Sequence, residues 1–122
     1  MALDTSNLVE LTMAICDIES VSGNEAALAD EVEKLLSGSQ HLSVVRDGNA
    51  IVASTNLGLG SRVVIAGHLD TVPVVNNLPT QLHHFEREQV IVGRGTVDMK
   101  AGVAVMLKLA VELVSPKFDV TW

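Results

Sequence analysis

The chain has 122 residues, of which 48% are hydrophobic, and a formal net charge of −7 at neutral pH. This length and apolar content suffice for one folded domain with a real core and argue against intrinsic disorder. The negative charge argues against a nucleic acid partner, which needs basic residues to neutralise its phosphates, and against an anionic membrane surface. We therefore expect a folded protein with no nucleic acid and no membrane as partner.

Cysteine usage and the absence of long apolar runs restrict the class of protein further. Cys16 is the only cysteine, which excludes an internal disulfide and a zinc site with several cysteine ligands. It lies in an apolar stretch with helical spacing, so a buried and inert thiol is expected. No secretory signal is visible, and no window reaches the ~18 apolar residues of a membrane span. These features predict a cytoplasmic location.

Two helices are predicted near the start of the chain. Leucine and isoleucine recur at helical spacing over residues 8–18, with Thr5 or Ser6 as the candidate N-terminal cap. Residues 22–25 read Ser-Gly-Asn-Glu, and a serine three residues before a glutamate is the pattern of a capping box. A second helix should therefore begin here, and the Ser-Gly-Ser at residues 37–39 should end it. Its apolar stripe consists of Leu28, Val32, Leu35 and Leu36.

Several short β-like runs follow the two helices. Residues 42–46 and 50–54 are separated by Asp-Gly-Asn at residues 47–49, which predicts a β-hairpin. Residues 62–67 are apolar after the first position and show no polar alternation, which predicts a strand buried on both faces of a largely parallel sheet. Residues 83–92 could form one strand or a short pair.

The last elements are an apolar helix and a strand. In the predicted helix at residues 100–114, only Lys108 and Glu112 clearly mark a wet side, so we expect the helix to be covered over most of its circumference. Residues 118–122 alternate with period two, which predicts a strand. The chain stops inside that pattern, so a truncated chain is expected; the alternative is a short domain that ends on an edge strand. Together the elements predict an α/β fold with a mixed, mostly parallel sheet flanked by helices.

His68 and Asp70 follow the predicted strand and form the first candidate site. Residues two apart on a strand point the same way, and α/β proteins place their sites beyond the carboxyl ends of strands. A carboxylate there is costly to desolvate unless a cation is near, and it can orient a metal-ligating imidazole. The pair therefore predicts half of a metal site. The alternative for His68 alone is a hydrogen-bonded core histidine.

Asp98 forms the second candidate site. It could cap the following helix, but the glycines at positions 93, 95 and 102 indicate tight backbone geometry around one carboxylate. Two carboxylate oxygens can reach two metal ions ~3.5–4 Å apart. Arg94 and Lys100 flank Asp98 and could face a substrate or solvent. His83 and His84 are adjacent, so on a strand they face opposite ways and suit one ion poorly.

Two motifs, at residues 67–73 (GHLDTVP) and 93–102 (GRGTVDMKAG), resemble those of the M20 family of zinc-dependent amidohydrolases and peptidases. The resemblance covers essentially all 122 residues. Within the family, residues 71–73 and 77–79 make the chain most similar to the succinyl-diaminopimelate desuccinylases. The order and separation of the two motifs are highly specific for the family.

The resemblance implies a role for each candidate residue. His68 would be a terminal ligand of one of two zinc ions, which cobalt could replace, and Asp98 would bridge both ions. Asp70 would be the catalytic-site acid that orients His68. The family also holds the peptide bond after the bridging aspartate in cis, so the Asp98–Met99 bond is expected to be cis.

The implied parent activity is metal-dependent hydrolysis of the amide bond of N-succinyl-LL-2,6-diaminopimelate, an N-acylated amino acid, to succinate and diaminopimelate in lysine and peptidoglycan biosynthesis. A Glu-Glu pair, an acidic ligand and a histidine would lie beyond this chain. Residues 1–122 would then be the N-terminal part of a zinc-peptidase-like catalytic domain. Its C-terminal half and the dimerisation domain of a homodimeric enzyme would be absent. The isolated chain is expected to be inactive. The alternatives are another M20 enzyme, such as an acetylornithine deacetylase or a dipeptidase, and a non-catalytic remnant.

Overall fold

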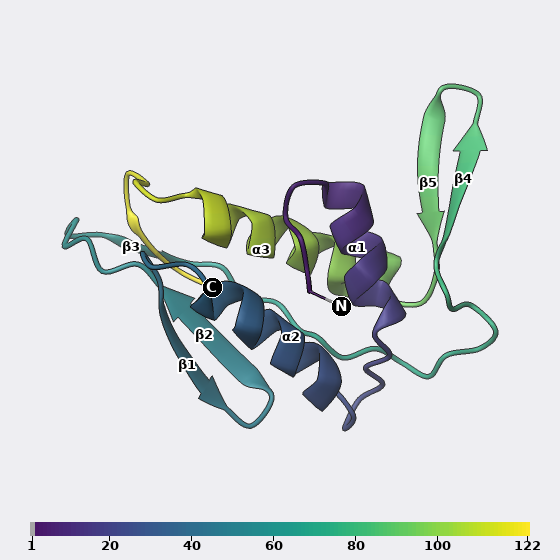
Figure 1. Cartoon of the computed structure of the whole chain (residues 1–122), viewed down its shortest axis with the longest axis horizontal. Helices are drawn as coiled ribbons and strands as arrows, with labels where there is room; N and C mark the ends of the chain where they lie inside the picture. The colour runs from purple at the N-terminus through teal and green to yellow at the C-terminus, as the bar shows by residue number, and fades with distance from the viewer. Residues whose placement is uncertain (1) are drawn as a thin grey trace.

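The computed structural model describes residues 2–122, which form three helices, a four-stranded sheet and a separate hairpin (Figure 1). The elements in chain order are α1 Leu8–Asp17, α2 Ala26–Ser37, β1 Ser43–Asp47, β2 Ala50–Ser54, β3 Arg62–Val64, β4 Gln81–Phe85, β5 Glu88–Val92, the kinked turn η1 Thr96–Lys100, α3 Ala101–Glu112 and β6 Asp119–Thr121. No helix within residues 2–122 is long and apolar enough to cross a membrane.

The main sheet has the strand order β1-β2-β6-β3. The α/β class and the mixed sheet are confirmed. The expectation that parallel pairing predominates is wrong for the strands described here, because only β3 and β6 pair in parallel. The two-residue turn at Gly48 and Asn49 folds β2 back antiparallel on β1, as the hairpin pattern predicts, and β6 then enters antiparallel to β2.

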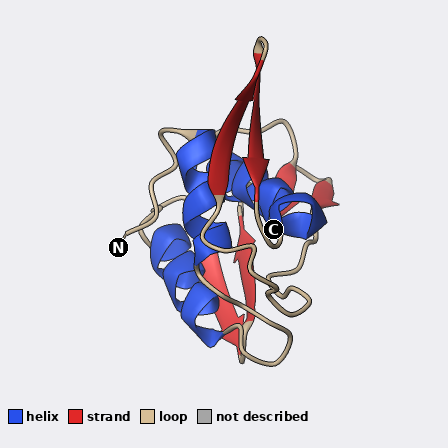
Figure 2. Ribbon diagram, turned by 90° about the vertical axis from the view of Figure 1, so that its right-hand side faces the viewer, coloured by secondary structure: helices blue, strands red, loops and turns tan. Residues whose placement is uncertain are grey.

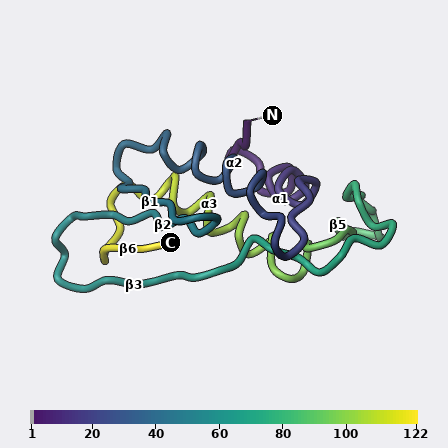
Figure 3. The backbone as a smooth tube through the Cα atoms, turned by 90° about the horizontal axis from the view of Figure 1, so that it is seen from below, coloured from purple at the N-terminus to yellow at the C-terminus, as the bar shows by residue number. Residues whose placement is uncertain are grey.

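Strand β3 lies at an edge of this sheet, so the prediction of a strand buried on both faces is wrong within residues 2–122. It ends at Val64 and pairs with β6 alone. The Val63 and Val64 side chains are 43% and 67% exposed. From β3 the chain runs without regular structure along one side of the molecule to the β4–β5 hairpin (Figure 3).

Strand β6 confirms the predicted strand at the end of the chain but lies inside the sheet, between β2 and β3, rather than at its edge. Asp119 is 4% exposed in spite of its polar side chain. Its carboxylate accepts hydrogen bonds from the backbone N–H groups of Leu57 and Leu59, at 2.7 and 3.0 Å, and from the Thr55 hydroxyl at 2.7 Å. These donors lower the pKa of Asp119 to about 2 and fix the loop between β2 and β3.

The helices form where they are predicted, but the N-terminal caps of α1 and α2 differ from the predicted ones. Asn7 caps α1, because its side chain accepts from two backbone N–H groups of the first turn while the Ser6 hydroxyl is bonded to Asp4. Helix α2 begins at Ala26 without a side-chain cap. The predicted capping box is wrong because the Ser22 hydroxyl donates to Asp70 instead, 48 residues along the chain.

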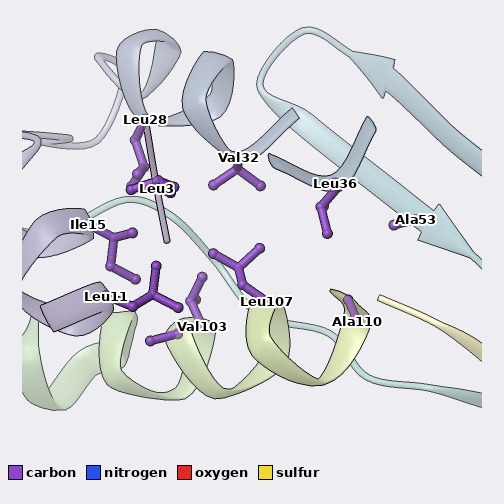
Figure 4. Packing of buried hydrophobic residues seen from close by; sticks show 11 residues of the cluster. Leu3, Leu11, Ile15, Leu28, Val32, Leu36, Ala53, Val103, Leu107 and Ala110 are labelled. Atoms are coloured by element: carbon purple, nitrogen blue, oxygen red, sulfur yellow. The ribbon is translucent and has the colours of Figure 1, made fainter. Parts of the chain in front are cut away.

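The hydrophobic core lies where α1, α2 and α3 meet and where α2 faces the sheet (Figure 4). Its central side chains are Leu11, Ile15, Leu28, Val32, Leu36, Val103 and Leu107. The opposite side of α3 is open, with Val105 42% and Leu109 36% exposed. The expected cover over most of this helix is therefore not found among residues 2–122.

The β4–β5 hairpin projects away from the rest of the molecule (Figure 2). Its strands pair antiparallel around a turn at Glu86 and Arg87. Of the two predicted alternatives, this segment therefore forms a short pair of strands and not one long strand. His83 and His84 lie next to each other on β4. The His83 ring stacks on Phe85 and hydrogen-bonds Gln81 at 3.1 Å.

Two leucines of α3 test the position of the core. We expect Leu107→Ala to lower the free energy of unfolding by about 2–5 kcal/mol, because Leu107 is 4% exposed and truncation leaves a cavity. Leu109→Ala should cost on the order of 1 kcal/mol, because more of that side chain is already in water. Urea unfolding of both variants measures the difference, and equal losses would contradict the packing described here.

Asp119→Asn tests the buried carboxylate of β6. We expect a lower Tm at neutral pH, because the asparagine NH2 group cannot accept from the donors that face it. The folded pKa of about 2 lies below the ordinary value of 3.8, so the carboxylate stabilises the fold above 3.8 and loses this effect as the pH falls toward 2. The difference in Tm between the wild type and the variant should therefore narrow over that interval. A difference in Tm that stays constant down to the lowest pH would contradict the stabilising role of the Asp119 carboxylate.

Candidate metal site

His68 and Asp98 meet although they lie 30 residues apart on different loops. His68 follows β3, and Asp98 lies in η1, where the backbone leaves helical geometry at Asp98 and Met99. The Nε2 atom of His68 is 3.0 Å from Oδ1 of Asp98. The Asp98–Met99 peptide bond is cis, as the resemblance implies.

Asp70 contacts the other nitrogen of the same ring. Its Oδ1 atom and its backbone carbonyl oxygen each lie 3.1 Å from Nδ1 of His68. The structure thus brings all three predicted site residues together, one carboxylate at each ring nitrogen. Their side chains are also reachable from solvent, with His68 45% and Asp70 41% exposed.

The two carboxylates determine the charge of the imidazole. Desolvation lowers the pKa of His68, but the hydrogen bonds to Asp98 and to the Asp70 carbonyl and the charges of both carboxylates outweigh it, so the pKa lies above 6.5. The hydrogen bond from Ser22 lowers the pKa of Asp70, and the charge of His68 adds to this effect. Without a metal, the site therefore favours an imidazolium that donates to the Asp98 carboxylate and to the Asp70 carbonyl, with the Asp70 carboxylate beside it.

The linker between α1 and α2 supports this site, and its role was missed from the sequence. The Ser22 Oγ atom donates to Oδ2 of Asp70 at 2.5 Å, and the Ser20 hydroxyl donates to the carbonyl of Leu69 at 2.6 Å. On the Asp98 side, Lys100 is 1% exposed and its Nζ atom donates to the carbonyl of Ile18 at 2.8 Å. The sequence signal for Ser22 was present but indicated a helix cap.

Two of the three glycines near Asp98 are required by close packing. A Cβ atom at Gly95, where φ is +83°, would lie 2.9 Å from a methyl carbon of Thr71, and one at Gly93 would lie 2.6 Å from the Thr80 methyl carbon. At Gly102 the nearest atom would be at an ordinary contact distance of 3.5 Å. The tight backbone predicted around Asp98 is therefore found on its N-terminal side.

An open pocket of about 440 Å³ surrounds the three side chains. Arg94 lines this pocket, whereas Lys100 is directed to Ile18. His83 and His84 do not line it. The pocket thus combines the imidazole and the carboxylates of the candidate site with one guanidinium group.

The His68–Asp98 pair suits a zinc ion as two of its ligands. Zinc binds nitrogen and oxygen at ~2.0–2.2 Å, so two such ligands at a tetrahedral angle are about 3.3 Å apart. The observed separation of 3.0 Å is close to this value. Asp70 on the far nitrogen supplies the carboxylate that commonly orients a metal-ligating histidine. Within residues 2–122, no cluster of three or more histidine, cysteine or acidic side chains is arranged to hold one ion.

The fold is that of a known peptidase structure. The crystal structure of aminopeptidase PepT from Bacillus cereus superposes with a TM-score of 0.72 at 20% sequence identity. The superposition covers 98% of this chain and 35% of that one. At this level of identity the likeness establishes the shared α/β fold.

Sequence comparison identifies the family. Residues 64–121 match the family described as Peptidase family M20/M25/M40. The chain is 48% identical over 114 residues to the "Putative succinyl-diaminopimelate desuccinylase DapE" of Mycobacterium tuberculosis, covering 93% of this chain and 31% of that relative. It is 45% identical over 101 residues to the succinyl-diaminopimelate desuccinylase of Corynebacterium glutamicum, covering 81% and 26%. The chain therefore belongs to the M20/M25/M40 peptidase family and spans about a third or less of the length of these relatives.

Gly95→Ala tests the close packing beside Asp98. The substitution combines a left-handed backbone conformation with a contact to Thr71, so it should destabilise the protein more than Gly60→Ala. Gly60 has a similar φ of +76° with nothing within 4 Å of the added carbon, so that control should cost about 1–2 kcal/mol. Thermal unfolding compares the stability of the two variants. Equal losses of stability would mean that the Thr71 side chain moves aside without an energetic cost.

Proposed function

We propose that the protein to which this chain belongs is a zinc-dependent amidohydrolase that converts N-succinyl-LL-2,6-diaminopimelate to succinate and diaminopimelate. The observation that carries the proposal is the 3.0 Å contact between His68 and Asp98, with Asp70 on the far side of the ring. The similarity to two relatives that bear the desuccinylase name supports the choice of substrate.

In this proposal His68 would be a terminal ligand of one zinc ion, and the Asp98 carboxylate would be shared by both ions. When bound, zinc supplies Lewis-acid polarisation of the amide carbonyl and a nucleophile near neutral pH. Cobalt(II), which accepts the same imidazole and carboxylate ligands, would serve as a substitute.

Asp70 prepares the histidine for this role. Because its pKa is lowered, its carboxylate is ionised at neutral pH, and its Oδ1 atom lies 3.1 Å from Nδ1 of His68, where its charge favours a proton on that nitrogen. A neutral ring with its proton on Nδ1 presents the lone pair of Nε2 toward Asp98. The carboxylate thus selects the tautomer that can bind metal, and it stabilises the ring as a ligand.

We propose further that residues 1–122 are one part of the catalytic domain. Zinc sites in proteins use about four ligands per ion, and the candidate site offers two. The other ligands, the general base and a dimerisation domain would then belong to residues outside these 122. The chain alone should bind zinc weakly and should not turn over substrate.

Calorimetric zinc titration of the metal-stripped chain tests the ligand assignment. We expect weak binding by the wild type, and His68→Ala and Asp98→Ala should each weaken it by more than about tenfold, the least that loss of a supporting group usually costs. His84→Ala is the matched control, because this exposed histidine lies on β4 outside the pocket. Binding that survives in both ligand variants would contradict the proposal.

An activity assay accompanies the titration. N-succinyl-LL-2,6-diaminopimelate, N-acetylornithine and a dipeptide form the substrate panel, since these distinguish the desuccinylase from the other M20 activities. The 122-residue chain should hydrolyse none of them. If this chain hydrolyses a substrate and His68→Ala abolishes the activity, two ligands suffice for catalysis. This result would overturn the proposal that the other ligands and the general base lie outside residues 1–122.

A further inference from the structure

The linker between α1 and α2 reaches the candidate site through one side chain. Ser22 Oγ lies 2.5 Å from Oδ2 of Asp70, and Oδ1 of the same carboxylate lies 3.1 Å from Nδ1 of His68. The opposite ring nitrogen is 3.0 Å from Asp98. Three contacts in series therefore join the serine hydroxyl to both proposed metal ligands.

The backbone beside Asp70 is held by the same linker. The Ser22 N–H donates to the Thr71 carbonyl at 3.0 Å, and the Thr71 N–H donates to the Ser20 carbonyl at 2.9 Å, so the two segments pair like parallel strands around Val21. The Ser20 hydroxyl adds a bond to Leu69 at 2.6 Å. These bonds fix the backbone on both sides of Asp70, but they leave its carboxylate free to rotate.

The Ser22 hydroxyl removes that freedom. Each oxygen of Asp70 has its own partner, Ser22 for Oδ2 and His68 for Oδ1. The carboxylate side chain is 41% exposed, so water would replace the hydroxyl if it were removed, and the carboxylate could turn away from Nδ1. Nδ1 of the imidazole would then keep the Asp70 backbone carbonyl as an acceptor but lose the charged carboxylate beside it, so the preference for a proton on Nδ1 over Nε2, which faces Asp98, would weaken.

A role in capping does not explain this serine. Helix α2 begins at Ala26, and its first turn receives no side-chain cap from the preceding residues. The Ser22 hydroxyl faces Asp70 and the Thr71 carbonyl instead. Its loss should therefore change the site more than it changes the stability of the helix.

We propose that Ser22 is a positioning residue, whose hydroxyl fixes the Asp70 carboxylate and through it the tautomer and orientation of the His68 ring. The expected effect of Ser22 on metal binding rests on the proposed function, whereas its expected effect on the tautomer of the His68 ring does not. The two effects can therefore be tested independently.

The test compares Ser22→Ala and Ser22→Thr with the wild-type chain. Ser54→Ala is the matched control, because it also removes one hydroxyl–side-chain bond, to Thr121 at 2.9 Å, but on the main sheet. Long-range proton–nitrogen NMR of the metal-free chain reads the tautomer of His68 at a pH where its ring is neutral. Calorimetry reads zinc affinity.

We expect Ser22→Ala to shift the His68 nitrogen signals toward an average of the two tautomers and to weaken zinc binding about ten- to a hundredfold. Ser22→Thr, which keeps the hydroxyl, should restore both readouts, and Ser54→Ala should alter neither. The Tm of Ser22→Ala should stay near that of Ser54→Ala.

Wild-type ring signals in Ser22→Ala would overturn the inference, and so would equal changes in the alanine and threonine variants, since these would point to the backbone rather than the hydroxyl. If the wild-type chain takes up no zinc, the proposed function fails. The ring signals would still decide the role of Ser22 in that case.

Discussion

The short linker between α1 and α2 holds the two loops that carry the candidate metal ligands. It binds the His68 loop through Ser20 and Ser22, and it binds η1 through the Lys100 ammonium on the Ile18 carbonyl. His68 and Asp98 have no regular structure of their own to fix their separation. Their 3.0 Å contact therefore depends on two sets of hydrogen bonds to one segment.

The interaction on the Asp98 side has a clear physical reason. Burial of Lys100 lowers its pKa, because a charged ammonium is costly to remove from water. A buried donor of this kind needs an acceptor, and the carbonyl of Ile18 at the end of α1 supplies it. The side chain that flanks Asp98 thus ties the site to the helical core rather than to solvent.

The sequence predicted those parts of the molecule that local patterns determine. The β1–β2 hairpin follows from its turn residues, and the convergence of His68, Asp70 and Asp98 follows from the resemblance carried by the two motifs. Strand alternation does not account for it, because β3 ends at Val64, before His68 and Asp70. The parts that it missed depend on distant partners. Ser22 looked like a helix cap because Asp70 is 48 residues away, and the alternation of residues 118–122 gave no sign of the buried Asp119 carboxylate because its donors lie on another loop.

The positions of β3 and β6 were missed for a related reason. An apolar run such as residues 62–67 indicates a strand but not its neighbours, and here β3 lies at a sheet edge with Val64 exposed. The exposed valines on β3 and α3 are consistent with two interpretations of the chain. It is either one part of a metalloenzyme or a non-catalytic chain. Metal binding at the candidate site is the property that distinguishes these two interpretations.

Zinc-edge anomalous diffraction from crystals of the chain soaked in zinc tests this property most directly. We expect an anomalous peak between His68 and Asp98, within about 2.0–2.2 Å of Nε2 and a carboxylate oxygen. Asp70 should remain on Nδ1 of the same ring. A peak at His83 or His84 alone, with none beside Asp98, would contradict it.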